Sequence, residues 1–77
     1  MAERTLDVEG LNCPLPILKA NRALKEMAAG ETLSVTATDP GAIADFETLC
    51  STTGNELLEA RQEGKVFHFL IRRGDRL

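Results

Sequence analysis

The segment Cys13-Pro14-Leu15-Pro16 places a thiol directly before two closely spaced prolines. Proline is tolerated in the first turn of a helix, where the backbone N–H groups have no partner within the helix. The spacing therefore predicts a helix that begins here, with Cys13 at its N-cap. At that position the helix dipole favours the thiolate, which is the nucleophilic form. The expected donors to the anionic sulfur are the N–H groups of Leu15 and Ile17, because proline has none.

These residues alone leave two interpretations of Cys13 open. In the first, Cys13 is a reactive thiolate that is presented by a turn stiffened by Pro14 and Pro16. In the second, it is an inert small residue beside a helix that the prolines start. Ser, Thr, Asp and Asn are better capping residues than Cys. A need for a helix cap therefore does not by itself explain why a cysteine stands at this position.

Cys50 is the second of the two cysteines in the chain. It shares a helical stripe with Ile43 and Phe46, so we expect it to be buried as a small hydrophobic residue. A disulfide between Cys13 and Cys50 is not expected, because one residue starts the first helix and the other lies well inside the second.

Asp39 and His68 are the other side chains considered for a site. Asp39 precedes Pro40, a pair that predicts the N-cap and first residue of a second helix. The Asp39 carboxylate is also expected on the same edge of the sheet as Cys13. A carboxylate close to Cys13 would raise the pKa of the thiol. His68 is expected to be a half-exposed strand residue and not a base for Cys13.

Hydrophobic periodicity defines the elements that must position these residues. Apolar residues recur with helical spacing at Ile17, Ala20, Leu24 and Met27, and they alternate in the segments expected to be strands. We expect Gly30 and Gly54 to end the two helices and Glu63-Gly64 to form a hairpin turn. The expected strands are residues 5–8, 31–38, 55–62 and 65–72, and the expected helices are residues 14–28 and 40–53.

The order βαβαββ predicts an α+β fold, a two-layer α/β sandwich over residues 1–77 as a single domain. Two helices on one face of a four-stranded mixed sheet is the economical packing. A right-handed crossover makes the first two strands parallel, and the last two form an antiparallel hairpin. Residues 11–16 and 38–41 should then lie at the same edge of the sheet, where ligands collect in open α/β sheets. The uncovered face, which bears Leu70, is a possible contact surface.

Composition excludes several classes of function. The 77 residues include 9 Lys and Arg against 12 Asp and Glu, a net charge of −3 that argues against direct nucleic-acid binding. One histidine and two separated cysteines provide no tetrahedral metal site. We expect no cofactor. The absence of a secretory signal and of a membrane segment predicts a reducing cytoplasm, where a thiol stays free, and we expect the chain to be a monomer. Lys19 and Arg22 are either solvated surface or cations that steer an acidic partner.

The chain resembles the TusA family of sulfur carriers, which includes SirA-like members. The likeness is carried by Leu11-Asn12-Cys13-Pro14-Leu15-Pro16 and continues, in order, through Gly30-Glu31-Thr32-Leu33, Ala37-Thr38-Asp39-Pro40, Asp45-Phe46 with Cys50, Thr53-Gly54, Leu57-Leu58 and Leu70-Ile71-Arg72. The family signature is the Cys-Pro-x-Pro motif. Many relatives carry His where this chain has Asn55, and some members of the tRNA pathway carry Glu where this chain has Leu15.

The resemblance implies the same sandwich fold and a role for Cys13. Its thiolate would accept sulfane sulfur as a persulfide from a donor such as a cysteine desulfurase or a rhodanese-like protein. It would then pass the sulfur to an acceptor protein in tRNA thiolation, molybdenum cofactor assembly or sulfur oxidation. Such sulfurtransferase chemistry depends on partner proteins, because the chain has no evident general base. The alternatives are a redox-sensitive regulatory or interaction module without sulfur transfer, and a structural domain that contacts RNA.

Overall fold

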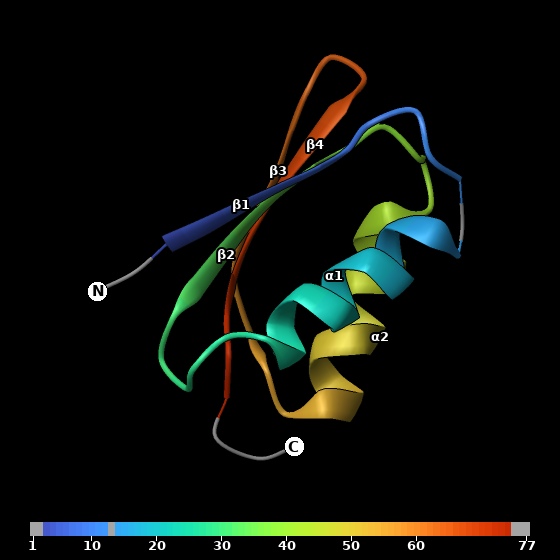
Figure 1. Cartoon of the computed structure of the whole chain (residues 1–77). Helices are drawn as coiled ribbons and strands as arrows, with labels where there is room; N and C mark the ends of the chain where they lie inside the picture. Colours follow the sequence, from blue (N-terminus) through green and yellow to red (C-terminus); the bar gives the residue numbers. More distant parts are fainter. Residues whose placement is uncertain (1–2, 13, 75–77) are drawn as a thin grey trace.

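The computed structural model describes residues 3–12 and 14–74 (Figure 1). The described chain forms four strands and two helices in the expected order. Their bounds are β1 Glu3–Val8, α1 Leu15–Lys25, β2 Thr32–Ala37, α2 Ala42–Thr53, β3 Glu56–Glu63 and β4 Val66–Arg72. Both helices lie on one side of the sheet, so the predicted two-layer α+β sandwich is confirmed (Figure 1).

The sheet is mixed and has the strand order β1-β2-β4-β3. β1 and β2 run parallel, joined by the α1 crossover, whereas β4 is antiparallel to both β2 and β3. The register between β3 and β4 shifts between Leu57 and Glu59, and Leu58 in this irregularity is 43% exposed. β1 and β3 are therefore the two edge strands, while the apolar strands β2 and β4 form the centre of the sheet.

The core lies between the sheet and the two helices. Alternate residues of β2 and β4 are buried on the helix-covered face, and Phe69 of β4 stacks on Phe46 of α2 with ring centroids 4.5 Å apart. The largest fully buried side chains are those of Phe46, Phe69, Leu24, Leu33, Ile71, Val8, Val35 and Pro16. The alternation and helical stripe in the sequence identified most of this core, but Ile17 and Ile43 are only half-buried.

The first helix is shorter than the periodicity suggests. It ends at Lys25 and not near Ala28, and Gly30 lies beyond its end. The carbonyl of Leu24 accepts a hydrogen bond from Met27 N at 3.1 Å and another from Arg73 Nε at 2.6 Å. These two donors satisfy a terminal carbonyl of the helix without a further helical turn.

The hairpin turn is also displaced by one residue from its expected place. Glu63 is the last residue of β3, and the two-residue turn is Gly64-Lys65 instead of Glu63-Gly64. Gly64 has φ +62°, which suits the first central position of a type II′ turn.

Residues 73 and 74 hold the end of the sandwich that is opposite the carboxyl ends of β1 and β2. Arg73 exchanges backbone hydrogen bonds with Gly30 and Glu31, both at 2.9 Å. Gly74 N donates to the side-chain oxygen of the buried Asn55 at 2.8 Å. Residues 73 and 74 are therefore fixed to the loops that follow both helices.

Gly74→Ala is expected to lower the free energy of unfolding by about 1–3 kcal/mol, because close packing has no room for an added methyl group. A Cβ at Gly74 would lie 2.0 Å from the carbonyl oxygen of Gly54. The matched control is Gly41→Ala, whose Cβ would meet nothing nearer than 3.8 Å. It should change stability by less than about 0.5 kcal/mol. Urea denaturation of the three proteins measures both effects, and equal midpoints would contradict the assignment.

Candidate functional site

The carboxyl ends of β1 and β2 form one edge of the sheet, which we call the carrier edge and define as residues 9–12, 14–16 and 38–41. Val8 and Ala37, the last residues of the two strands, are register partners. The two loops that follow are joined directly, since Gly10 N donates to Thr38 Oγ1 at 2.8 Å. The sequence-based prediction that these loops share an edge is confirmed. Cys13 itself lies outside the described residues.

The segment that follows Cys13 starts α1, but with a different assignment of the cap. Pro14 is the N-cap and Leu15 the first helical residue, so the predicted N-cap position of Cys13 is wrong. Leu15 N donates to the carbonyl of Asn12 at 2.9 Å. This N–H group is therefore engaged and is not the donor to sulfur that we expected. The turn closed by Asn12 and Leu15 moves the helix start one residue further along the chain.

The two prolines of the motif have different surroundings. Pro16 is fully buried in the core, whereas Pro14 is exposed and Leu15 is 45% exposed. Leu18, one turn further along α1, is 56% exposed. Pro16 thus anchors the start of α1 while Pro14 and Leu15 face solvent.

Asp39 lies on the carrier edge as predicted, but it is not the N-cap of α2. Gly41 is the N-cap and α2 begins at Ala42. The Asp39 carboxylate accepts a hydrogen bond from Gly41 N at 3.2 Å, and its carbonyl accepts one from Ala42 N at 3.0 Å. Asp39 therefore shapes a turn that leads from β2 into α2, a common role of aspartate, and this turn displaces the helix start by two residues.

Cys50 is buried as predicted and is a free thiol. Only 4% of its surface is exposed, on the inner side of α2. Burial raises the pKa of the Cys50 thiol from its ordinary value of 9.0 to about 11, because the low-polarity interior disfavours the thiolate. Cys50 is thus poorly suited to act as a nucleophile.

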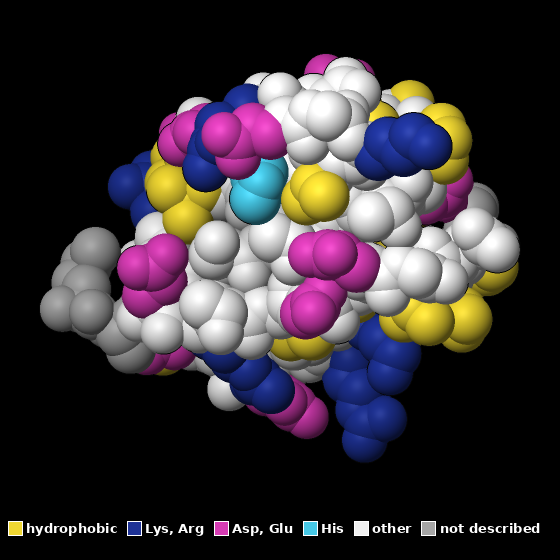
Figure 2. Space-filling view, turned by 90° about the horizontal axis from the view of Figure 1, so that it is seen from above, with side chains coloured by type: hydrophobic (Ala, Val, Ile, Leu, Met, Phe, Trp, Pro, Cys, Tyr) yellow, Lys and Arg dark blue, Asp and Glu magenta, His cyan; other side chains and the backbone are white. Residues whose placement is uncertain are grey.

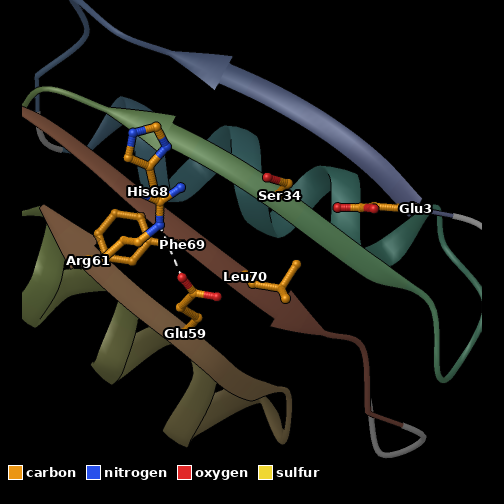
Figure 3. A pocket seen from close by; sticks show the side chains of 7 residues that line it. All are labelled: Glu3, Ser34, Glu59, Arg61, His68, Phe69 and Leu70. Carbon is orange, nitrogen blue, oxygen red and sulfur yellow. Dashed lines mark ion pairs between the residues drawn. The ribbon is translucent and has the colours of Figure 1, made fainter. Parts of the chain in front are cut away.

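His68 lies on the sheet face that the helices leave uncovered, and it is half-buried as predicted. Its Nε2 is 3.1 Å from a Glu63 carboxylate oxygen, which Arg61 also contacts at 2.9 Å. This histidine, the one in the chain, lies among acidic and basic side chains (Figure 2). It lines a shallow hollow of about 190 Å³. Ser34 and Leu70 are among the other side chains that line this hollow (Figure 3). His68 therefore belongs to a charged cluster on β3 and β4.

A groove between α1 and α2 was not predicted from the sequence. Its volume is about 310 Å³, and it is lined by Pro14, Ile17, Asp45, Thr48, Leu49 and Thr52. The signal that could have indicated it is a stripe of small polar residues on α2, since Asp45, Thr48 and Thr52 recur at i, i+3 and i+7. The short side chains of this stripe leave space between α2 and α1.

The described residues contain no cluster of histidine, cysteine, aspartate or glutamate that could hold a metal ion. In the same part of the chain, neither helix has the length and apolar character needed to cross a membrane.

The fold is that of SirA-like proteins. The crystal structure of a SirA-like protein from Desulfitobacterium hafniense superposes with a TM-score of 0.81, covering 96% of this chain and 100% of that one at 24% sequence identity.

Sequence comparisons then define the family. The family model described as Sulfurtransferase TusA matches residues 4–73. A sulfur carrier protein TusA from Allochromatium vinosum is 52% identical over 92% of this chain and 93% of its own length. A putative sulfur carrier protein from Neisseria meningitidis is 51% identical over 92% of this chain and 96% of its own length. This chain belongs to the TusA family, and its role is that of a sulfur carrier.

Cys50 should make the stability of the protein sensitive to alkaline pH. The unfolded chain ionises this thiol near pH 9.0, and the folded chain only near pH 11. Between these values the unfolded state binds fewer protons, so the free energy of unfolding falls as the pH rises. Wild type should therefore lose more stability than Cys50→Ala from pH 9.0 to 11 in urea titrations. Parallel pH profiles for the two proteins would show that Cys50 is not desolvated.

Proposed function

We propose that Cys13 is the residue that carries the sulfur, as a persulfide. Support comes from the family match, which spans the Cys-Pro-x-Pro motif, and from the residues next to Cys13. Pro14 and Leu15 are exposed at the carrier edge, and Pro16 anchors them to the core. A protein partner can approach this edge, whereas Cys50 is enclosed. The single observation that carries the proposal is the exposure of Pro14 and Leu15, the residues that directly follow the one cysteine besides Cys50 in the sequence.

The proposed chemistry consists of two thiolate displacements. The Cys13 thiolate attacks the outer sulfur of a donor persulfide, so a new S–S bond forms on Cys13 while the donor's S–S bond breaks. The donor cysteine leaves as a thiolate. A thiolate of the acceptor then attacks the outer sulfur on Cys13, and Cys13 leaves in turn. Both steps follow the rules of thiol–disulfide exchange, in which the thiolate is the reactive form.

We assign the motif residues roles in presenting this sulfur. Pro14 and Pro16 fix the backbone on both sides of Leu15, and the exposed Leu15 side chain offers apolar surface to a partner. With the Leu15 amide engaged by Asn12, the Ile17 amide and the helix dipole remain the proposed stabilisers of the anionic sulfur. Asp39, which lies on the same edge of the sheet as the start of α1, is the charge proposed to tune the thiol.

The partners in this proposal are proteins, and the protein acts in the cytoplasm. A cysteine desulfurase or a rhodanese-like protein would supply the persulfide, and an acceptor of tRNA thiolation, molybdenum cofactor assembly or sulfur oxidation would remove it. A reducing compartment keeps Cys13 available as a thiol. The carrier is proposed to act as a monomer, so that the carrier edge meets one partner at a time.

The direct test is the intact mass of the protein after incubation with a persulfide donor. Wild type and Cys50→Ala should each gain the mass of one sulfur atom, and dithiothreitol should remove it. Cys13→Ser should gain none. Oxygen addition or a mixed disulfide in place of added sulfur would instead favour a redox-sensing module.

Asp39→Asn separates a structural role of this residue from an electrostatic one. The amide oxygen of asparagine can still accept the hydrogen bond from Gly41, so the turn is kept. Removal of a nearby negative charge should lower the pKa of the Cys13 thiol. The measurement is the pH dependence of alkylation by iodoacetamide, with Glu47→Gln as the control for net charge. If the two variants have the same profile as wild type, Asp39 only shapes the turn.

A further inference from the structure

We propose that the groove between α1 and α2 receives an apolar side chain of the partner protein, with a lysine or arginine of the same partner segment against Asp45. The inference rests on the proposed function, because it places the partner's cysteine-bearing segment beside Cys13.

The position of the groove relative to Cys13 supports this assignment. Pro14 lines the groove and is joined to Cys13 by a peptide bond. Ile17 contributes from the next turn of α1, and the largely buried Leu49 contributes from α2. A partner segment that reaches Cys13 therefore comes close to the groove, because the next residue of this chain, Pro14, lines it.

The size and lining of the groove fit side chains better than a small-molecule ligand. Its volume of about 310 Å³ is at the lower end of the range for ligand sites, which are roughly 300–1,000 Å³. The hydroxyl of Thr52 is already bonded to the carbonyls of Thr48 and Leu49 within α2. An apolar side chain can thus enter without leaving this hydroxyl unsatisfied.

Charge identifies the chemistry of the partner. Among the groove's lining residues Asp45 is the charged one, and no lysine or arginine lines it. A second carboxylate is near, because a Cβ on Gly41 would be 3.8 Å from both Asp39 and Asp45 oxygens. The sequence segments around this edge, residues 7–18 and 38–48, contain acidic residues and no lysine or arginine. A cationic side chain is therefore the complementary neighbour for the apolar one.

A second hollow, on the other side of α1, is lined by several cationic side chains and is a weaker candidate for a partner-binding site. It lies between α1 and β1, and Pro14 is not part of its lining. Its cations Arg4 and Arg22 are 3.1 and 3.9 Å from the carboxylate of Glu26. Their charge is partly compensated within the chain, so this hollow provides less attraction for an acidic partner.

Disulfide exchange on Cys13 tests the groove without the sulfur donor. The probes are the tetrapeptides Cys-Gly-Leu-Arg, Cys-Gly-Ser-Arg and Cys-Gly-Leu-Glu, each supplied as its mixed disulfide with glutathione. Cys13 attacks the peptide sulfur, and glutathione leaves as a thiol. At equilibrium, the amount of wild-type protein disulfide-bonded to Cys-Gly-Leu-Arg should be about fivefold higher than the amount bonded to either other peptide. A difference of this size is expected from the partial burial of one leucine side chain, which Cys-Gly-Ser-Arg lacks, or from one ion pair, which Cys-Gly-Leu-Glu cannot form.

Two groove variants and two matched controls complete the test. Thr48→Phe fills the groove and should abolish the preference for leucine, whereas Ser51→Phe, also on an exposed position of α2, should not. Asp45→Lys should remove the preference for arginine, whereas Glu47→Lys, with the same change in charge, should keep most of it. Equal capture of the three peptides by wild type, or equal effects of groove variants and controls, overturns the proposal. Peptide preference without sulfur uptake in the mass assay would instead reject only the carrier chemistry of Cys13.

Discussion

β1 and β2 pair in parallel from Glu3 opposite Thr32 to Val8 opposite Ala37, and α1 crosses between them on the covered face. Because both strands are then followed by a helix, the residues that start α1 and those that lead to α2 must lie at one edge of the sheet. The hydrogen bond from Gly10 to Thr38 joins the two loops at that edge. The exposure of Pro14 and Leu15, the turn at Asp39 and the opening of the interhelical groove all depend on this pairing.

The two ends of the sandwich are built differently. At one end, Arg73 and Gly74 bind the loops after α1 and α2 through backbone and side-chain hydrogen bonds, and Asn55 is buried among them. At the carrier edge, Pro14 and Leu15 are exposed, and of the described motif residues Pro16 alone is buried. A small domain has little stability to spare. The hydrogen bonds of Arg73 and Gly74 therefore stabilise the end of the sandwich that lies opposite the carrier edge.

Periodicity and proline placement were enough to predict the order of elements, the two layers and most of the core, because alternation and helical spacing report directly on burial. They did not predict the helix starts. Pro14 and Gly41 are the N-caps in place of Cys13 and Asp39. Before α1, Leu15 N bonds to the carbonyl of Asn12, and before α2 the Asp39 carboxylate accepts a hydrogen bond from Gly41 N, so a turn precedes each helix start. The early end of α1 depends on Arg73, which is distant in sequence. The groove was missed because it needs the relative position of two helices.

The burial of Cys50 bears on how a sulfur carrier avoids transferring sulfur to its own second thiol. A persulfide is attacked by any thiolate that reaches it, so a second accessible thiol would compete with the acceptor. Cys50 shares the molecule with Cys13, but it faces the core from α2 and is kept protonated there by desolvation. The same packing that makes Cys50 a core residue therefore removes it as a competitor. For sulfur carried on Cys13, as proposed, the described part of the chain then offers no competing thiolate.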